Sequence, residues 1–263
     1  MKNFTADNEV LYHVGFAGKD LQHAKWALLP GDPGRVEALA KSIGPASFIA
    51  SHREYTSWLT YLEGEPVLVC STGMGGPSVA ICLEELARMG IEGVIRVGTT
   101  GTIQEYINLG DVIINQAAVR LDGTSAHYAP VNFPAVADFT VTSALKQAAD
   151  ALQIPCHLGI SASSDTFWPG QERYDSFTGY VRKSLQGSLK EWQQLGVLNY
   201  EMETSALFVT AQCLGIKAGA ICGVIAKRTE SESIAPPEVY KLAEERFQLA
   251  ARETLRLLLK AGV

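Results

Sequence analysis

One arginine of this sequence, Arg96, interrupts an apolar run that extends over residues 94–97. Such a run predicts a buried strand, and a buried guanidinium is costly unless it meets an anion or a carboxylate. The run ends in Gly-Thr-Thr-Gly at residues 98–101, which predicts a turn whose backbone a ligand can approach closely. The pattern therefore suggests an anion site at the end of a central strand. An arginine paired with a structural carboxylate, beside glycines that only form a turn, explains the same residues equally well.

A second anion-binding pattern follows the short apolar strand predicted at residues 26–29. Asp32 and Pro33 are a favourable N-cap and first helical position, and Gly31 leaves backbone amides open at the start of the helix. A helix N-terminus of this kind attracts anions, and Arg35 one turn along would add positive charge. Taken alone, these residues also fit a capped turn with a surface arginine.

Two further groups of polar residues suit the two halves of a nucleoside. Glu201 and Glu203 bracket one residue at a predicted helix start, and such carboxylates can accept hydrogen bonds from ribose hydroxyls. Phe167, Gln171 and Arg173 follow a predicted strand and suit a flat polar heterocycle, because an amide both donates and accepts while a guanidinium only donates. An anion, a sugar and a base in one cleft suggest phosphate attacking a nucleoside.

Strand-like and helix-like segments alternate along the chain, which predicts an α/β fold with a mixed sheet flanked by helices. Strands are expected near residues 26–29, 51–61, 67–70, 94–97, 111–120, 157–163, 197–200 and 218–226. Helices are expected near residues 33–43, 77–89, 142–152, 189–195 and 201–214, and from residue 236 onward, with a long irregular stretch over residues 121–137. The polar clusters follow strand ends, where ligands of such folds bind. Residues 1–263 are predicted to form one domain, with residues 1–12 loosely ordered.

Composition argues against several classes of protein. The chain has 263 residues, of which 47% are hydrophobic and 19% charged, so a globular protein with a sizeable core is expected. A net charge of −6 makes nucleic-acid binding through a broad basic surface unexpected. The five cysteines include no CxxC pair and predict reduced thiols, not a disulfide framework or a zinc site. Neither a signal peptide nor a membrane span is predicted, so a cytoplasmic protein is expected.

Six segments resemble motifs of the nucleoside phosphorylase family, and specifically of its uridine branch. They are PGDPGR (30–35), SHREY (51–55), STGMGGPS (71–78), IRVGTTG (95–101), FWPGQERYD (167–175) and NYEMETSAL (199–207). Their order and spacing are consistent from about His13 to Arg228, and Gln171 with Arg173 separates the uridine branch from the purine branch. The resemblance implies a pentosyltransferase that reversibly converts uridine and phosphate to uracil and ribose 1-phosphate in pyrimidine salvage. Deoxyuridine and thymidine are expected to react more weakly.

The resemblance also implies a role for each matching residue. The residues implied for phosphate are Gly31, Arg35, Arg53, Arg96 and Thr99. Those implied for uracil are Thr100, Gly101, Phe167, Gln171 and Arg173, with Ile225 and Ala226 lining the base pocket. Those implied for ribose are His13, Glu201, Met202 and Glu203. Among all of these, the catalytic residues are expected to be Arg96, Gln171, Arg173 and Glu203.

The implied fold is a mixed sheet that forms a distorted barrel, and the implied assembly is a homohexamer built as a trimer of dimers. His13 and Arg53 would then reach the site of a neighbouring subunit. Phosphate is the co-substrate, no organic cofactor is implied, and no nucleic acid or membrane partner is expected. A monovalent cation such as K⁺ would bind Glu54, Ser78 and the backbone of Met74 at a subunit interface.

One departure from the uridine branch concerns the base pocket. Ala226-Lys227 stand where valine and asparagine are common, and alanine widens the wall, which suggests tolerance for 5-substituted uracils. The aspartate that the purine branch places near this strand end is absent, which argues against purine substrates. The rival hypotheses are a purine nucleoside phosphorylase, a nucleoside hydrolase, which would not need the phosphate arginines, and a non-catalytic nucleoside-binding protein.

The roles of several single residues are considered separately. Glu201 either contacts ribose or supports a phosphate arginine, and Arg228 either contacts the base-binding loop or caps a strand. We expect Asp165 to cap its loop and Trp168 to pack against its surroundings. A structural or interfacial role is expected for His127, because a lone histidine has many uses.

Overall fold

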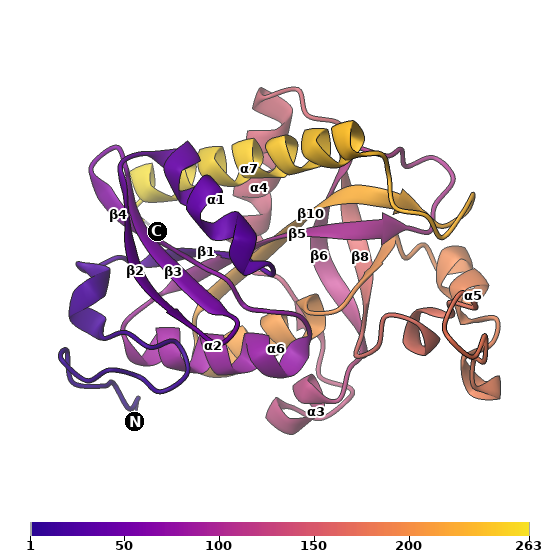
Figure 1. Ribbon diagram of the computed structural model, residues 1–263, viewed down its shortest axis with the longest axis horizontal. Coiled ribbons are helices and arrows are strands. Elements are labelled where there is room, and N and C mark those ends of the chain that lie inside the picture. The colour runs from indigo at the N-terminus through magenta and orange to yellow at the C-terminus, as the bar shows by residue number, and fades with distance from the viewer. Residues whose placement is uncertain (1, 263) are drawn as a thin grey trace.

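The computed structural model describes residues 2–262, so Met1 and Val263 lie outside the described residues. One mixed sheet dominates the fold, with the strand order β10-β6-β8-β9-β5-β1-β4-β3-β2 and with β7 paired to β6 (Figure 1). The strands are β1 Trp26–Pro30, β2 Ala46–His52, β3 Tyr55–Leu62, β4 Glu65–Cys70, β5 Gly93–Thr102, β6 Val112–Leu121, β7 Ala135–Val136, β8 Cys156–Ser164, β9 Asn199–Glu201 and β10 Lys217–Lys227. The loose ordering expected for residues 1–12 stays a prediction.

Five of these strands close into a barrel. Strand β10 pairs with β6 on one side and with β5 on the other, so β10, β6, β8, β9 and β5 form a ring. Within the ring β10 runs parallel to β5 but antiparallel to β6, and β9 runs antiparallel to β5. A register shift between Val224 and Ala226 of β10 distorts the barrel locally, because a bulge bends its strand. The predicted mixed sheet with a distorted barrel is confirmed.

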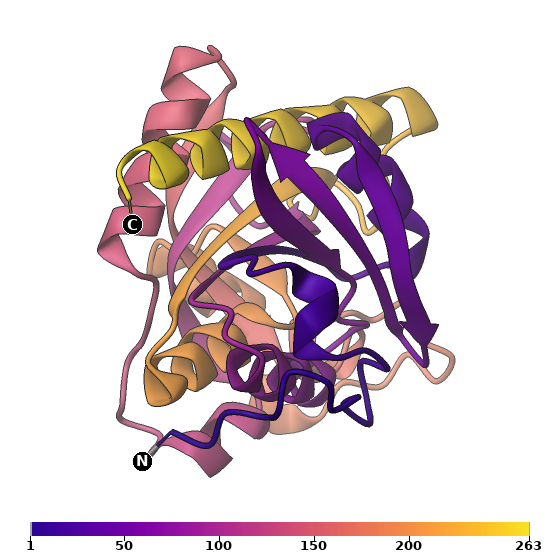
Figure 2. The same ribbon diagram turned by 90° about the vertical axis from the view of Figure 1, so that its left-hand side faces the viewer.

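Helices cover the two faces of the sheet. They are α1 Val36–Ile43, α2 Gly76–Arg88, α3 Thr124–Tyr128, α4 Phe139–Ala151, α5 Ser188–Gln194, α6 Thr204–Leu214 and α7 Pro237–Lys260. Helices α2 and α6 lie on one face, whereas α1, α4 and α7 lie on the other (Figures 1 and 2). Side chains of β5 alternate between the two cores: Val94 packs in the α2/α6 core, and Ile95 and Val97 pack in the α1/α4/α7 core.

The turn predicted at residues 98–101 is wrong. These residues continue β5, paired with residues of β10 along their whole length and with β9 at Gly101. The glycines serve close packing within the strand instead of a turn: a Cβ atom on Gly98 would lie 3.0 Å from Nη2 of Arg96, and one on Gly101 would lie 3.3 Å from Cδ of Arg228. Hydrogen bonding by two neighbouring strands overrides the local turn signal.

Three other expectations needed correction. The stretch over residues 121–137 is not irregular throughout, because it contains α3 and β7. Strand β2 was not predicted as a separate strand, and a turn at residues 53–54 divides it from β3. Helix α4 begins at Phe139, three positions before the predicted start at residue 142. The carboxylate of Asp138 caps this start by accepting a hydrogen bond from the Val141 amide at 3.0 Å. Among the helices formed by residues 2–262, none has the length and apolarity to cross a membrane.

Candidate active site

A cavity of about 610 Å³ opens where strand ends converge on the barrel, a size typical of sites for small ligands. Its walls come from β5, β9 and β10, from the segments that follow β1, β4, β8, β9 and β10, and from the turn between β2 and β3. All of the predicted site residues line it except His13, Arg53 and Ser78. The lining also includes residues that the sequence had not assigned to ligands: Asp32, Pro33, Gly73, Gly98, Tyr200 and Ile234. All of these except Ile234 lie inside the motifs quoted above, so their place in a motif was the signal by which the sequence could have assigned them to the site.

Arg96 lies at one end of the cavity, 5% exposed, on the central strand β5. Its Nη2 forms an ion pair with Glu203, and its Nε lies 3.8 Å from Oε2 of Glu201. Burial lowers the pKa of Arg96, but the carboxylates of Glu203 and Glu201 and the nearby Cys222 raise it above its ordinary value, so the guanidinium stays charged. Nε and Nη1 have no hydrogen-bond partner among residues 2–262. One edge of Arg96 therefore meets carboxylates, as the structural interpretation expects, whereas binding of an anion by the remaining donors stays a prediction.

Gly31 and Arg35 approach the same end of the cavity. A Cβ atom on Gly31 would lie 3.3 Å from the Gly73 carbonyl oxygen and 3.8 Å from Nη1 of Arg96, so only a bare backbone fits comfortably here. The guanidinium of Arg35 is anchored to α7: its Nε lies 2.7 Å from Oε1 of Glu244, and its Nη2 donates to the Tyr240 hydroxyl. We call this region, with Gly31, Arg35, Arg96 and Thr99, the phosphate end of the cavity, after the role that the sequence predicts for these residues.

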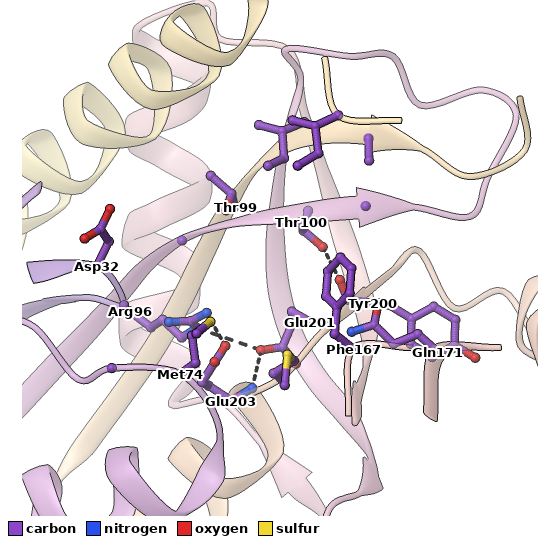
Figure 3. Close-up of a pocket in the computed structure, with 18 of the residues that line it drawn as sticks. Asp32, Met74, Arg96, Thr99, Thr100, Phe167, Gln171, Tyr200, Glu201 and Glu203 are labelled. Carbon is purple, nitrogen blue, oxygen red and sulfur yellow. Dashed lines mark hydrogen bonds and ion pairs between the residues drawn. The ribbon is translucent and has the colours of Figure 1, made fainter. Parts of the chain in front are cut away.

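Glu201 and Glu203 form a buried network beside Arg96 (Figure 3). Glu203 accepts a hydrogen bond from the Gly75 amide at 2.7 Å, at the start of α2, and one from Arg96. Glu201 accepts from the Ser163 hydroxyl and from the amides of Glu203 and Thr204, at 2.8 and 2.7 Å respectively. Burial and the neighbouring Glu203 raise the pKa of Glu201, although Arg96 and Ser163 act in the opposite direction. The partners of Glu201 favour its supporting role over direct contact with ribose.

Phe167, Gln171 and Arg173 gather at the opposite end, which we call the base end after the role that the sequence predicts for them. In Figure 3, Phe167, Gln171 and Tyr200 lie on one side of the cavity and Arg96, Met74 and Glu203 on the other, with Thr99 and Thr100 of β5 between them. The Arg173 guanidinium lies over the Phe167 ring, 4.2 Å from its centroid. The Arg228 Nη1 donates to the Gln171 carbonyl at 2.7 Å, so Arg228 contacts the loop that is predicted to bind the base.

Thr100, Ile225 and Ala226 complete the wall between the two ends. The Thr100 hydroxyl donates to the Tyr200 carbonyl at 2.6 Å and accepts from the Asn199 amide group at 2.8 Å, so it ties β5 to β9. Ala226 is buried and pairs with Gly101 across the β5–β10 ladder. A larger residue at position 226 would therefore change the shape of the base end.

Three residues that were expected to have structural roles lie outside the cavity lining. Asp165 accepts a hydrogen bond from the Gly123 amide at 2.8 Å, which joins its loop to the chain before α3. Trp168 packs edge-on against Phe167, with ring centroids 5.3 Å apart, and does not line the cavity. His127 lies in α3 on an exposed surface, outside the cavity lining.

His13 and Arg53 lie in one cluster through their neighbours His52 and Tyr12, and neither lines the cavity of their own chain. His13 Nδ1 lies 2.6 Å from Oε1 of Glu85, and the His13 carbonyl lies 3.0 Å from Nδ1 of His52. Arg53 donates to the Tyr12 hydroxyl at 3.2 Å. We call Tyr12, His13, His52 and Arg53 the N-terminal cluster; it lies on the protein surface beside the β2–β3 turn.

The residues predicted to hold a monovalent cation also lie close together. Glu54 packs against Gly73, where a Cβ atom would lie 2.8 Å from Cγ of Glu54 and 3.4 Å from Oγ of Ser78. The Ser78 hydroxyl donates to the Met74 carbonyl at 3.1 Å. A carboxylate, a carbonyl and a hydroxyl are oxygen ligands suited to a hard cation. Within the described part of the chain no group of three His, Cys, Asp or Glu residues could hold a metal ion.

Comparison with known proteins agrees with this geometry. The sequence model of the Phosphorylase superfamily matches residues 25–261. The chain belongs to this family. The uridine phosphorylase of Escherichia coli (strain K12) is 49% identical to it over 249 residues, which cover 95% of this chain and 98% of that protein. The uridine phosphorylase of Haemophilus influenzae is 52% identical over 222 residues, covering 84% of this chain and 88% of that protein. A relative named for a purine nucleoside, the guanosine phosphorylase of Halorubrum lacusprofundi, is 32% identical over 87% of this chain and 90% of its own.

Proposed function

We propose that this protein is a uridine phosphorylase, a pentosyltransferase that converts uridine and phosphate reversibly to uracil and ribose 1-phosphate. The observation that carries the proposal is the arrangement of polar side chains in the cavity. Arg96 lies at the phosphate end, and Gln171 and Arg173 lie at the base end. The similarity to two uridine phosphorylases, at 49% and 52% identity, supports uridine over the guanosine named for the relative at 32%.

Phosphorolysis requires the protein to hold two anions on either side of a sugar that develops positive charge. Arg96 and Arg35 at the phosphate end offset the charge of the incoming phosphate, and Gly31 and Thr99 add a bare backbone and a hydroxyl. Holding the phosphate next to the anomeric carbon adds the gain from positioning. Buried guanidinium groups act strongly here because they are already oriented when charge develops.

The base end stabilises the leaving uracil. Gln171 and Arg173 donate hydrogen bonds that strengthen as negative charge grows on the base, so no complete proton transfer is needed. Thr100, Gly101, Phe167, Ile225 and Ala226 shape this part of the site. Glu203, with Met202 beside it, orients the ribose hydroxyls between the two ends, and Glu201 supports Glu203 and Arg96. This chemistry uses no organic cofactor.

The proposal also includes the oligomeric assembly, a bound cation and the cellular role of the protein. A homohexamer built as a trimer of dimers would place the N-terminal cluster, with His13 and Arg53, at the cavity of a neighbouring subunit, and the absence of both residues from the lining of their own cavity supports this arrangement. Glu54, Ser78 and the Met74 carbonyl would hold a monovalent cation near such an interface. The chain, one domain over residues 1–263, would act in pyrimidine salvage in the cytoplasm, with deoxyuridine and thymidine as weaker substrates.

Product formation with and without phosphate tests the proposal. Purified protein is incubated with uridine in phosphate buffer and in a phosphate-free buffer, and uracil and ribose 1-phosphate are separated and quantified. We expect uracil only when phosphate is present, with an equal amount of ribose 1-phosphate. Uracil release that does not depend on phosphate would indicate a hydrolase, and the absence of release would indicate a different substrate or a binding protein.

A further inference from the structure

Two buried arginines at the base end share one carboxylate. Arg173 is 4% exposed and Arg228 is 7% exposed. Glu232 accepts hydrogen bonds from Arg228 Nε at 2.7 Å and from Arg228 Nη2 at 2.8 Å, and its Oε2 also accepts one from Arg173 Nη1. Glu232 lies in the segment between β10 and α7, which none of the motifs quoted above includes.

The carboxylate of Glu232 compensates for repulsion between the two guanidinium groups. Burial and the neighbouring Arg228 lower the pKa of Arg173, whereas Glu232 raises it. Like charges that lie this close in a protein interior repel strongly, so the pair needs an anion between its members. With Glu232 the three groups carry one net positive charge, which still suits a base that becomes anionic.

Arg173 is the member of the pair that would move without the carboxylate. Arg228 is held independently by the Gln171 carbonyl and lies over the Tyr200 ring, 5.4 Å from its centroid. Among the described residues, the guanidinium of Arg173 lies over the Phe167 ring and donates to Glu232, and Asp175 is a further carboxylate that raises its pKa. Its Nε is buried without a hydrogen-bond partner among the described residues, which leaves a donor for a ligand.

We propose that Glu232 is a positioning residue, which holds Arg173 against Phe167 so that the guanidinium faces the departing base. Glu232 also fixes the segment that carries Ile234, a residue of the cavity wall, and the Ala235 amide closes this segment by donating to the Ile225 carbonyl at 2.7 Å. The proposal rests on the function proposed above, because it assigns Glu232 to the uracil side of that reaction.

The competing explanation is an ordinary ion pair. The side chain of Glu232 is 32% exposed, and pairs with such exposure often contribute little. If Glu232 had only a structural role, its substitution would lower the melting temperature and would reduce kcat/KM for uridine and for phosphate alike. A positioning role would instead act on uridine while leaving the phosphate end unchanged, because the two ends are built on different segments.

The test compares Glu232→Gln with Glu230→Gln. Glu230 is a matched control on the same segment, since it pairs with Lys227 at 3.0 Å and lies outside the cavity lining. For Glu232→Gln we expect kcat/KM for uridine to fall about 10- to 100-fold, as for a catalytic group held in the wrong place, with KM for phosphate within about twofold of wild type. For Glu230→Gln both parameters should remain within about twofold of wild type.

A second substrate separates positioning from simple loss of stability. The fluorine of 5-fluorouridine withdraws electrons, so its base leaves as an anion more readily and needs less help from Arg173. We therefore expect Glu232→Gln to lose less kcat/KM with 5-fluorouridine than with uridine. Equal losses with both nucleosides, or a parallel loss on the phosphate side, would overturn the proposal.

A conservative variant covers the case in which Glu232→Gln folds poorly. Glu232→Asp keeps the charge on a shorter side chain, so it should retain more of the uridine kcat/KM than Glu232→Gln at a similar melting temperature. Equal loss in the two variants would overturn the proposal. A wild-type protein without phosphate-dependent uracil release would refute the proposed function, whereas an active wild type with an unaffected Glu232→Gln would refute only the role of Glu232.

Discussion

Both ends of the cavity balance a buried guanidinium with a carboxylate, but they do so on different structural elements. At the phosphate end, Arg96 stands on the central strand β5, and Glu203 precedes the first turn of α6. At the base end, Arg173 and Glu232 both lie on connecting segments, one after β8 and one after β10. In each case a buried guanidinium is balanced by a carboxylate that still leaves donors for a ligand.

The difference in scaffold fits the tasks that we propose for the two ends. Phosphate is small and keeps its charge when it enters, so a rigid strand can hold its site ready in advance. The base gains charge only during the reaction, and its contacts must strengthen at that stage. Connecting segments have lower local stability than central strands, which allows such adjustment. Substitutions at the two ends should therefore affect the two substrates separately.

The largest effect is expected for Arg96→Ala. Removing this guanidinium takes away buried donors for phosphate and leaves Glu203 and Glu201 without their cation, so kcat/KM for phosphate should fall about 10³-fold. Arg256→Ala is the control, because Arg256 pairs with Glu253 on α7 and lies outside the cavity lining. Steady-state rates with varied phosphate test this, and an unchanged phosphate dependence would place the anion elsewhere.

A smaller loss is expected for Arg173→Ala. The variant keeps Gln171 and Arg228 at the base end, so uridine turnover should fall about 10²-fold, as when one donor to a developing anion is removed. Initial rates of uracil release at saturating phosphate measure this effect. Turnover within a few-fold of wild type would mean that Gln171 alone stabilises the leaving base.

The smallest effect is expected for Ala226→Val. Ala226 is buried against Gly101, and two added methyl groups would fill space beside the base, so the thymidine-to-uridine ratio of kcat/KM should fall about fivefold. The comparison uses both nucleosides with the wild type and the variant under the same conditions. Equal ratios in the two proteins would show that position 226 does not set tolerance for 5-substituted uracils.

Much of the site could be predicted because its residues lie at strand ends with strong local signals. Arg96 interrupts an apolar strand, and Phe167, Gln171 and Arg173 follow the end of β8. The extension of β5 through Thr102 could not be read locally, because glycine and threonine favour a turn until β10 and β9 pair with them. The sequence did not predict β2 as a separate strand for a similar reason. This edge strand is largely exposed and lacks a clear alternation of buried and exposed residues.

The partners of the arginines were the main omission. Arg35 meets Tyr240 across 205 positions of sequence, and Arg173 meets Glu232 across 59. Neither Glu232 nor Glu244 stands in a motif, and each resembles any charged residue near a helix start or on its surface. Only the packing of α7 and its preceding segment onto the barrel brings these groups together, so the sequence alone carried no signal for them.

The most direct test of a cavity divided into two ends is a pair of binding titrations. Calorimetry would measure the affinities of phosphate and of uracil for the wild type, Arg96→Ala and Arg173→Ala. Two separate ends predict that Arg96→Ala loses phosphate affinity while uracil affinity stays within about twofold, and that Arg173→Ala does the reverse. Parallel loss of both affinities in either variant, with the fold intact by melting temperature, would contradict the assignment of the two ends.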